Sequence, residues 1–216
     1  VCSSDLSWSV RSNHQGWMDI GNGVQKKYSY QINGQRVDHL SEQEMMPVRA
    51  DLGMIFQEGA LFDSLTVREN VGYKLYEETD MPLAEIDTRV TEVLGFIGLA
   101  EHLDKMPSAL SGGQRRRVAI ARALVIEPAI LLADEPTGNL DSKTSREVIE
   151  LFRQLNEERG ITVILVTHDL NVAKNARRIL VLRDGSIVAD TTKFEEAFNF
   201  LHSTGSIHPE DQSPQE

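Results

Sequence analysis

The 216-residue chain carries 22 Lys and Arg against 33 Asp and Glu, a formal net charge of −11, and 40% of its residues are hydrophobic. A chain of this length can bury a full core, so we expect one globular domain with room for a small inserted subdomain. The acidic balance has the wrong sign for a broad grip on nucleic acid, and we expect no nucleic-acid partner. The longest apolar runs fall far short of the roughly 18 to 20 residues that span a bilayer. Cys2 is the single cysteine, which rules out an internal disulfide and favours a reducing, cytoplasmic location.

The first part of the chain divides into an irregular segment and a hairpin. Residues 1–28 have no clear periodicity and begin with Val rather than Met, so we interpret them as a non-matching or truncated segment. After them, Tyr30 and Ile32 alternate with polar residues and lead into Asn33-Gly34, a strong turn signal. This pattern predicts a hairpin that closes with residues 35–37.

Farther along the chain, short apolar runs alternate with amphipathic helices. Pro82 opens one helix, and another follows residue 114. Their apolar residues recur at helical spacing: Ile86, Val90, Val93 and Ile97 in the first, and Val118, Ala121 and Leu124 in the second. The continuous apolar runs at residues 129–133 and 162–167 predict buried parallel strands. Strands that alternate with helices predict an α/β fold with a mainly parallel sheet.

The helix after the first of these strands has signals at both ends. Asp141 or Ser142 caps its start, and Gly160 closes it. Its apolar face consists of Val148, Leu151, Phe152 and Leu155. Two further short strands flank Asp184-Gly185 and predict a hairpin. Residues 203–216 turn to Ser, Pro, Gln and acids, which predicts a disordered acidic tail.

An acidic pair follows the first buried strand. Asp134 stands at the carboxyl edge of that strand, where a carboxylate can hold Mg²⁺. Glu135 beside it can polarise a water for in-line attack on a γ-phosphate. Acidic pairs are also common as helix-start or turn residues. The neighbouring motifs therefore decide between the two interpretations.

A glycine-containing loop precedes the helix that follows residue 114. Gly112 and Gly113 allow close approach of the backbone to an anion, the Ser111 hydroxyl can donate, and the helix N-terminus adds partial positive charge. A bare Ser-Gly-Gly is more often a flexible loop. The arginines at positions 115–117 are more often a solvated face or a dimer contact than a nucleic-acid site.

Five motifs, taken together and in order, resemble those of the ABC ATPase family. They are Gly53 to Gln57 (Q-loop), Leu110 to Gln114 (signature motif), Ile130 to Glu135 (Walker B strand and catalytic glutamate), Gly138 to Asp141 (D-loop) and Val163 to His168 (switch histidine). The resemblance implies a P-loop NTPase-like ABC ATPase core over residues 29–202, with a mainly parallel sheet. It also implies an inserted α-helical subdomain at about residues 67–118.

The resemblance assigns roles around ATP and Mg²⁺ within one subunit. Gln57 is implied to touch the Mg²⁺ or the attacking water and to sense the permease. Asp134 is implied to bind Mg²⁺ through water, and Glu135 to act as base or to position the water. His168 is implied to hold the γ-phosphate.

Other residues are implied to act across a dimer. Ser111, Gly112 and Gly113, followed by Gln114, resemble the loop that contacts the ATP held by the opposite subunit. Asp141 resembles the residue that communicates across the interface. The family pattern therefore implies a homodimer or pseudo-dimer with two ATP molecules between its subunits.

One expected motif is absent from the 216 residues. ABC ATPases need G-x-x-x-x-G-K-[ST], whose backbone amides cradle the phosphates while Lys neutralises them. Gly16 and Gly21 have the right spacing, but Asn22 and Gly23 stand where Lys and Ser or Thr are required. We interpret this spacing as coincidence and expect little ATP hydrolysis from the chain as written.

The resemblance implies the nucleotide-binding subunit of an ABC transporter, held at the inner face of the cell membrane by an integral membrane permease. Residues 59–71 resemble ATPases of bacterial phospholipid trafficking, and residues 134–145 resemble those of lipoprotein release and macrolide export. We expect a lipid or lipoprotein-type cargo. The alternatives are a non-transport ABC ATPase of DNA repair or translation, and a catalytically dead, truncated homologue.

Overall fold

The structure is a computed structural model that describes residues 17–19, 24–26, 31–32, 35–37, 39–50, 52–56, 60–183 and 186–202. Two compact units make up the chain, Val1–Val166 and Thr167–Glu216. Most of the buried apolar residues belong to the first unit.

The first unit begins with two short antiparallel pairs. β1 (Trp17–Asp19) pairs with β2 (Val24–Lys26), within the segment where the sequence shows no periodicity. β3 (Gln31–Ile32) pairs with β4 (Gln35–Arg36) in a register that places Ile32 opposite Gln35. The predicted hairpin is therefore confirmed, although its turn residues lie outside the described part of the chain. The helix α1 (Glu42–Ala50) follows.

Three parallel strands form the central sheet. Their order is β5 (Leu52–Ile55), β6 (Ile130–Asp134) and β7 (Thr162–Val166), so β6 is the middle strand. The two strands predicted at residues 129–133 and 162–167 are thus confirmed within one residue at their ends. β6 is largely buried, as predicted, whereas β7 is only half-buried and ends at the exposed Val166. Gly53 is required for the packing of β5, because a Cβ there would lie 2.8 Å from the carbonyl oxygen of Ala123 and 2.9 Å from Leu131 Cδ1.

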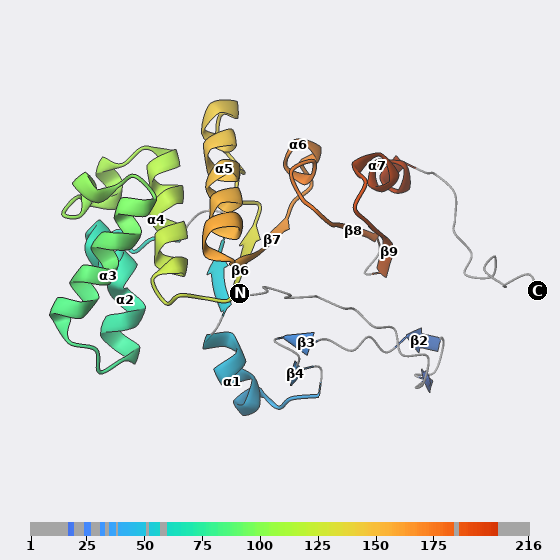
Figure 1. Cartoon of the computed structure of the whole chain (residues 1–216), viewed down its shortest axis with the longest axis horizontal. Coiled ribbons are helices and arrows are strands. Elements are labelled where there is room, and N and C mark those ends of the chain that lie inside the picture. The colour runs from blue at the N-terminus through green and yellow to red at the C-terminus, as the bar shows by residue number, and fades with distance from the viewer. Residues whose placement is uncertain are drawn as a thin grey trace, which may run out of the picture. The chain divides into compact units, whose positions relative to one another are not determined.

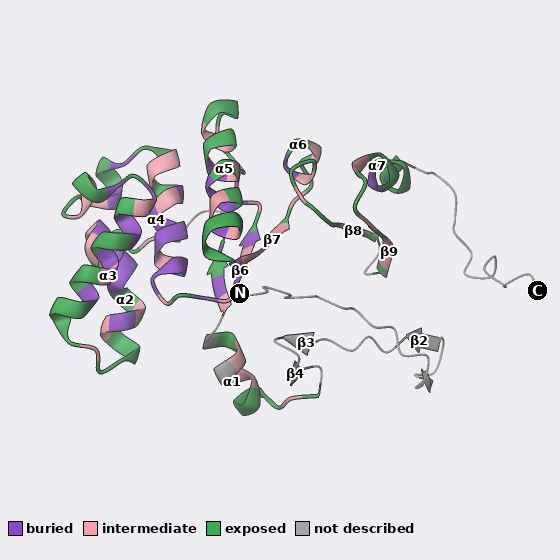
Figure 2. Cartoon of the chain, viewed as in Figure 1, coloured by how far each residue is buried: buried purple, intermediate pink, exposed green. Residues whose placement is uncertain are grey.

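A group of helices lies between β5 and β6 in the sequence and forms one cluster in space (Figure 1). It contains α2 (Val67–Glu78), α3 (Leu83–Phe96), the short 3₁₀ helices η1 (Ala100–His102) and η2 (Pro107–Ala109), and α4 (Gly112–Leu124). Figure 2 shows buried residues along α2, α3 and α4 where these helices face one another. The predicted apolar stripes of α3 and α4 are all buried, as helical spacing requires.

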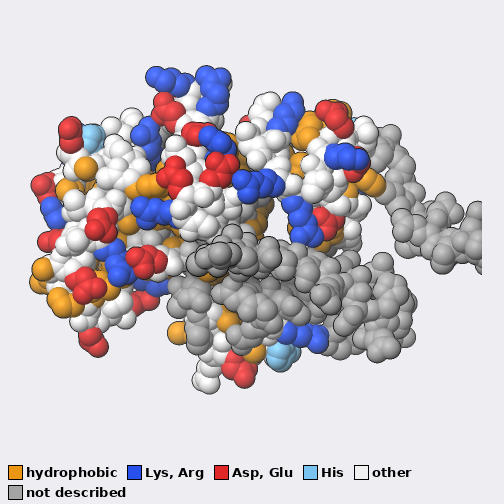
Figure 3. Space-filling view, viewed as in Figure 1, with side chains coloured by type: hydrophobic (Ala, Val, Ile, Leu, Met, Phe, Trp, Pro, Cys, Tyr) orange, Lys and Arg blue, Asp and Glu red, His pale blue; other side chains and the backbone are white. Residues whose placement is uncertain are grey.

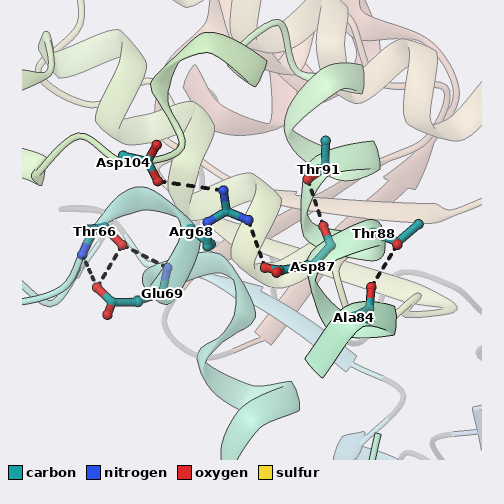
Figure 4. A network of polar contacts seen from close by, with 8 residues as sticks. All are labelled: Thr66, Arg68, Glu69, Ala84, Asp87, Thr88, Thr91 and Asp104. Atoms are coloured by element: carbon teal, nitrogen blue, oxygen red, sulfur yellow. Dashed lines mark hydrogen bonds and ion pairs between the residues drawn. The ribbon is translucent and has the colours of Figure 1, made fainter. Parts of the chain in front are cut away.

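Polar contacts fix the start of α2 to the helices around it (Figure 4). Thr66 and Glu69 form a capping box, which satisfies amides at the helix N-terminus. The Arg68 guanidinium lies 2.8 Å from an Asp87 carboxylate oxygen on α3 and 3.7 Å from one of Asp104. The buried Asn70 side chain accepts from the Phe62 amide at 2.8 Å and donates to the Leu65 carbonyl at 2.9 Å. The loop before α2 is therefore held in place by specific hydrogen bonds.

The helix α5 (Ser142–Arg159) follows the central strand. Asp141 is its N-cap, and Gly160 ends it in the left-handed conformation with φ of 68°. Its predicted apolar face is buried. Both end signals and the stripe are confirmed. The face seen in Figure 3 carries interspersed acidic and basic side chains. Two ion pairs involve α5: Arg117 with Glu147, and Arg153 with Glu150.

The second unit contains α6 (Leu170–Ala173), β8 (Ile179–Arg183), β9 (Ser186–Thr191) and α7 (Phe194–His202). β8 and β9 pair antiparallel, which confirms the predicted hairpin. Arg178, the residue before β8, donates two hydrogen bonds of 2.7 and 2.6 Å to the Asp190 carboxylate on β9. Among the helices of the described residues, none is long and apolar enough to cross a membrane.

Candidate functional site

The candidate site begins at the edge where the three parallel strands end. Ile55 ends β5, Asp134 ends β6 and Val166 ends β7, and the register places Asp134 beside Val166. Carboxyl ends of parallel strands are where α/β proteins bind ligands. Gln57 follows β5 by two residues and lies outside the described residues.

Asp134 and Glu135 differ in their surroundings. Asp134 is exposed at the end of its strand, whereas Glu135 is half-buried and has φ of 42°. This conformation costs a residue with a side chain about 1 to 3 kcal/mol and persists where neighbouring contacts enforce it. The Glu135 amide donates to the Val166 carbonyl oxygen at 2.9 Å, and its own carbonyl accepts from the Gly138 amide at 3.0 Å. The turn after β6 is thus fastened to β7.

The two carboxylates at this edge suit a metal ion that needs few protein ligands, such as Mg²⁺. Among the described residues, no group of three or more His, Cys, Asp or Glu side chains could hold a metal ion. Mg²⁺ usually binds through one or two carboxylates and takes its remaining ligands from water and phosphate. An exposed Asp134 with Glu135 beside it matches that demand.

The loop from Ser111 to Gln114, hereafter the signature loop, starts α4. Ser111 is the N-cap, and its hydroxyl accepts from the Gln114 amide at 3.2 Å. In return, the Gln114 side-chain oxygen accepts from the Ser111 amide at 2.9 Å. This capping box satisfies the Ser111 and Gln114 amides, and the other amides of a first helical turn have no partner within the helix. Such a helix N-terminus suits an anion, as expected from the sequence.

The signature loop packs against the start of α5, residues 141–144, hereafter the Asp141 turn. A Cβ on Gly113 would lie 2.5 Å from Thr144 Cγ2, which is too close for any side chain. Thr144 in turn donates its hydroxyl to Asp141 at 2.5 Å, and the Asp141 carboxylate also accepts from the Lys143 and Thr144 amides. These hydrogen bonds lower the pKa of Asp141, and the bond from the Thr144 hydroxyl has the largest effect. One chain therefore brings Gly113 and Asp141 together through Thr144.

Arg116 departs from the sequence interpretation. The sequence predicts a solvated face or a dimer contact for the arginines at 115–117, but Arg116 is only 5% exposed. Its guanidinium donates to the Phe56 carbonyl oxygen at 2.7 Å and lies 3.4 Å from that of Gly138. Burial lowers the pKa of this guanidinium. It links the start of α4 to the end of β5 and to the turn after β6.

Helical spacing could have identified Arg116. Ile120 and Ala123 follow it by four and seven residues, and both are buried. Three adjacent arginines point in different directions around a helix, so one of them must lie near the apolar stripe. Arg115 and Arg117 do remain at the surface, where Arg117 pairs with Glu147 at 2.7 Å.

His168 belongs to the second unit, where its side chain is exposed. Asp169, the next residue, caps α6 by accepting from the Asn171 amide at 2.8 Å. The local sequence around His168 is therefore a helix start that follows a strand end.

Comparison with known proteins identifies the class. The sequence profile described as ABC transporter matches residues 21–138, more than half of the chain. Methionine import ATP-binding protein MetN of Bifidobacterium longum is 47% identical over 158 residues, which are 73% of this chain and 39% of that protein. The macrolide export ATP-binding/permease protein MacB of Syntrophobacter fumaroxidans is 48% identical over 160 residues, which are 73% of this chain and 22% of that protein.

A solved structure agrees with these sequences. The ATP-binding cassette MJ0796, in a dimeric post-hydrolysis state bound to ADP and Pi, matches with a TM-score of 0.66 and 39% identity over 77% of this chain and 73% of that one. The chain belongs to the ABC transporter family, and its fold is that of the ATP-binding cassette, as the five motifs predict. It spans less than half the length of the curated relatives described above.

Proposed function

We propose that this chain is the nucleotide-binding part of an ABC transport system, in which ATP binding and hydrolysis drive a separate membrane permease. One observation carries the proposal: the chain contains both halves of a shared nucleotide site. The first half is the acidic pair at the carboxyl end of β6. The second half is the helix N-terminus at the signature loop, which suits an anion and packs against the Asp141 turn. This is the arrangement that a nucleotide shared between two such chains requires.

Within one chain, Asp134 would hold Mg²⁺ through water, and Glu135 would serve as base or orient the attacking water. The strained backbone at Glu135 and its tie to Val166 support this assignment, because phosphoryl transfer depends on positioning and charge stabilisation more than on covalent chemistry. Gln57 and His168 complete the proposed set, with Gln57 at the Mg²⁺ or water and His168 at the γ-phosphate. When bound, Mg²⁺ neutralises charge on the transferred phosphate.

Across a dimer, the signature loop would contact the ATP of the opposite chain. This loop offers the Ser111 hydroxyl, the amides of a helix N-terminus and, at Gly112 and Gly113, no side-chain bulk. The contact of Gly113 with Thr144 places the Asp141 turn beside this loop, so both would meet the partner together. The dimeric state of the solved relative supports a homodimer or pseudo-dimer.

A permease would dock near the loop before α2. Phe62 and Tyr73 are 43% and 40% exposed, and their ring centroids lie 4.7 Å apart. Aromatic residues are enriched at protein interfaces. The hydrogen bonds from Asn70 hold the backbone of this loop, so the aromatic pair is presented on a fixed support. Such docking would place the chain at the inner face of the cell membrane.

The cargo remains a prediction from residues 59–71, which resemble phospholipid-trafficking ATPases. The two relatives described above are named for methionine import and macrolide export, not for lipid transport. In the proposed system the nucleotide-binding chain does not contact the cargo. The names of the relatives and the resemblance of residues 59–71 therefore concern the whole transport system, not the ATP site. Transport of a lipid or lipoprotein-type cargo is the finer proposal.

A second candidate applies to the 216 residues acting alone, as a chain that keeps the fold without turnover. The 216 residues contain no G-x-x-x-x-G-K-[ST] run. Without a phosphate cradle, the acidic pair would have no well-positioned γ-phosphate to act on. The signature loop would be unaffected, and such a chain could still complete the site of a partner.

Co-purification from membranes tests the proposed function. The tagged chain, extracted with mild detergent, is expected to carry a multi-span membrane protein. Phe62→Ser should reduce its recovery at least severalfold, because it removes an exposed aromatic contact while the Phe62 backbone keeps its bonds to Asn70. Leu83→Ser is the matched control, since Leu83 is 71% exposed on α3. Recovery with nucleic acid or ribosomes instead would favour a non-transport ABC ATPase.

A further inference from the structure

His102 contacts the signature loop from outside the family motifs. It ends η1, and its Nε2 atom lies 2.9 Å from Nε2 of Gln114. Its other ring nitrogen, Nδ1, is buried and has no hydrogen-bond partner among the residues that the structure describes. A buried polar atom without a partner is costly, so this histidine calls for a physical explanation.

The hydrogen bonds of Gln114 determine which nitrogen of His102 carries the proton. The Ser111 amide can only donate, so the Gln114 atom facing it must be the side-chain oxygen, at 2.9 Å. The amide nitrogen of Gln114, which can only donate, then faces His102. His102 Nε2 must accept, and the proton of the neutral ring must reside on the buried Nδ1.

We propose that His102 is a positioning residue for the signature loop. Its Nε2 lone pair holds the Gln114 amide so that the side-chain oxygen stays on the Ser111 amide. The Ser111 oxygen accepts from the Gln114 amide at 3.2 Å, which leaves the hydroxyl proton free to turn outward. That proton would meet a phosphate oxygen of the partner's ATP. The inference rests on the proposed function for this last step only.

The unpartnered Nδ1 supports a role beyond packing. A leucine would fill the same space without burying a polar group, whereas this ring keeps a costly N–H in order to present an acceptor to Gln114. The glutamine in turn is fixed at both ends, by Ser111 and by His102. Three residues from two elements therefore form one chain of hydrogen bonds that ends at the Ser111 hydroxyl.

Nuclear magnetic resonance of the ¹⁵N-labelled full chain tests the assignment directly. With the ring neutral, the His102 imidazole is expected to show a protonated Nδ1 and an unprotonated Nε2. His102→Gln identifies the signal by removing it. A neutral ring protonated on Nε2 would overturn the proposal, because two donors would then face each other. The measurement needs no nucleotide, so its outcome is separate from that of the proposed function.

The exchange rate of the Ser111 amide proton with water tests the consequence. His102→Leu should raise this rate about two- to tenfold, which corresponds to the net free energy that one hydrogen bond contributes. His102→Gln should restore it, because its side-chain oxygen reaches the place of Nε2. The Val125 amide, bonded to the Ala121 carbonyl at 3.0 Å at the other end of α4, reports general loosening of the helix. An unchanged Ser111 rate in His102→Leu, or equal rates in both variants, would contradict the proposal. If the Val125 amide also exchanges faster in His102→Leu, the variant is not specific, and the protonation of the His102 ring in the unaltered chain then tests the proposal.

Discussion

Gly113 lies where the chain has no room for a side chain. We predict that Gly113→Ala displaces Thr144, since the new Cβ would lie 2.5 Å from its Cγ2 atom. The displacement should weaken the bond from Thr144 to Asp141 and destabilise the chain by about 1 to 3 kcal/mol, as overpacking typically does. Urea denaturation measures the loss, and amide exchange at Lys143 and Thr144 shows whether it reaches the Asp141 turn.

A compensating change separates steric coupling from general damage. Gly113→Ala combined with Thr144→Ser should recover most of the stability, because serine lacks Cγ2 and keeps the hydroxyl. Gly112→Ala is the matched control, since the nearest atom to its added Cβ, Leu140 Cδ2, lies at 3.9 Å. A double variant as unstable as Gly113→Ala alone would show that Thr144 does not link the two segments.

Single residues also mark the limit of sequence analysis. The motif residues Ser111, Asp134 and Asp141 stand where their local patterns predict: at a helix N-cap, at a strand end and at a second N-cap. Helical spacing indicates that Arg116 is buried, but it does not indicate that the guanidinium donates to the Phe56 carbonyl oxygen 60 positions away. His102 was missed because its contact with Gln114 joins two separate elements, which no periodicity within one element reveals.

At the scale of elements, the strength of the apolar pattern decided what could be predicted. α3, α4 and α5 carry stripes at helical spacing, and β6 and β7 are continuous apolar runs, so all five were predicted. α2 has no such stripe, because its buried positions include Asn70 and Gly72. Asn70 is buried for its hydrogen bonds to the loop before the helix, which an apolar pattern cannot reveal. α1, with a mixed and largely polar sequence, was missed for a similar reason.

The start of α5 supports a prediction about acid stability. Hydrogen bonds from the Thr144 hydroxyl and nearby amides favour the ionised form of Asp141 and lower its pKa below the ordinary 3.8. A lowered carboxylate pKa contributes stability that is fully present above the unfolded pKa and is lost as pH falls through the folded pKa. Asp141→Ala should therefore lower the unfolding midpoint at neutral pH and lower it much less under strongly acidic conditions, measured by thermal denaturation.

Two variants serve as references for this cap. Asp141→Asn keeps an oxygen acceptor without the charge, so it should retain much of the midpoint and lose the part that depends on ionisation. Ser142→Ala alters the next position, which is exposed, and should leave the midpoint nearly unchanged. A loss in Asp141→Ala that is the same at neutral and strongly acidic pH would show that ionisation of Asp141 does not contribute.

At the scale of the whole molecule, the order of five motifs predicted the family, and the sequence profile and the solved relative confirmed it. The motifs could predict this much because each one requires particular residue types at a particular strand end or helix start. The domain boundaries and the roles of the site residues remain predictions. A site completed by a second chain depends on an interface that neither the sequence nor a single chain contains.

ATP turnover tests the central claim most directly. Without a phosphate cradle and its Lys, we predict that the chain as written turns over ATP slowly or not at all, since loss of comparable electrostatic donors costs on the order of a hundredfold to a thousandfold in rate. Placing the strand, loop and helix of a complete family member before residue 29 should restore turnover. The measurement is the ATPase rate of the grafted and ungrafted chains, with the dimer followed by size-exclusion chromatography.

Glu135→Gln, made in both the grafted and the ungrafted chain, tests the role of the proposed base. In the grafted chain it should abolish turnover and trap an ATP-bound dimer, because the phosphate cradle and the signature loop still bind nucleotide while the proposed base is lost. In the ungrafted chain it should trap nothing. Rapid turnover by the ungrafted chain that disappears in Glu135→Gln would contradict the account of its first 28 residues. A grafted chain that binds ATP but neither hydrolyses it nor dimerises would contradict the proposed site itself.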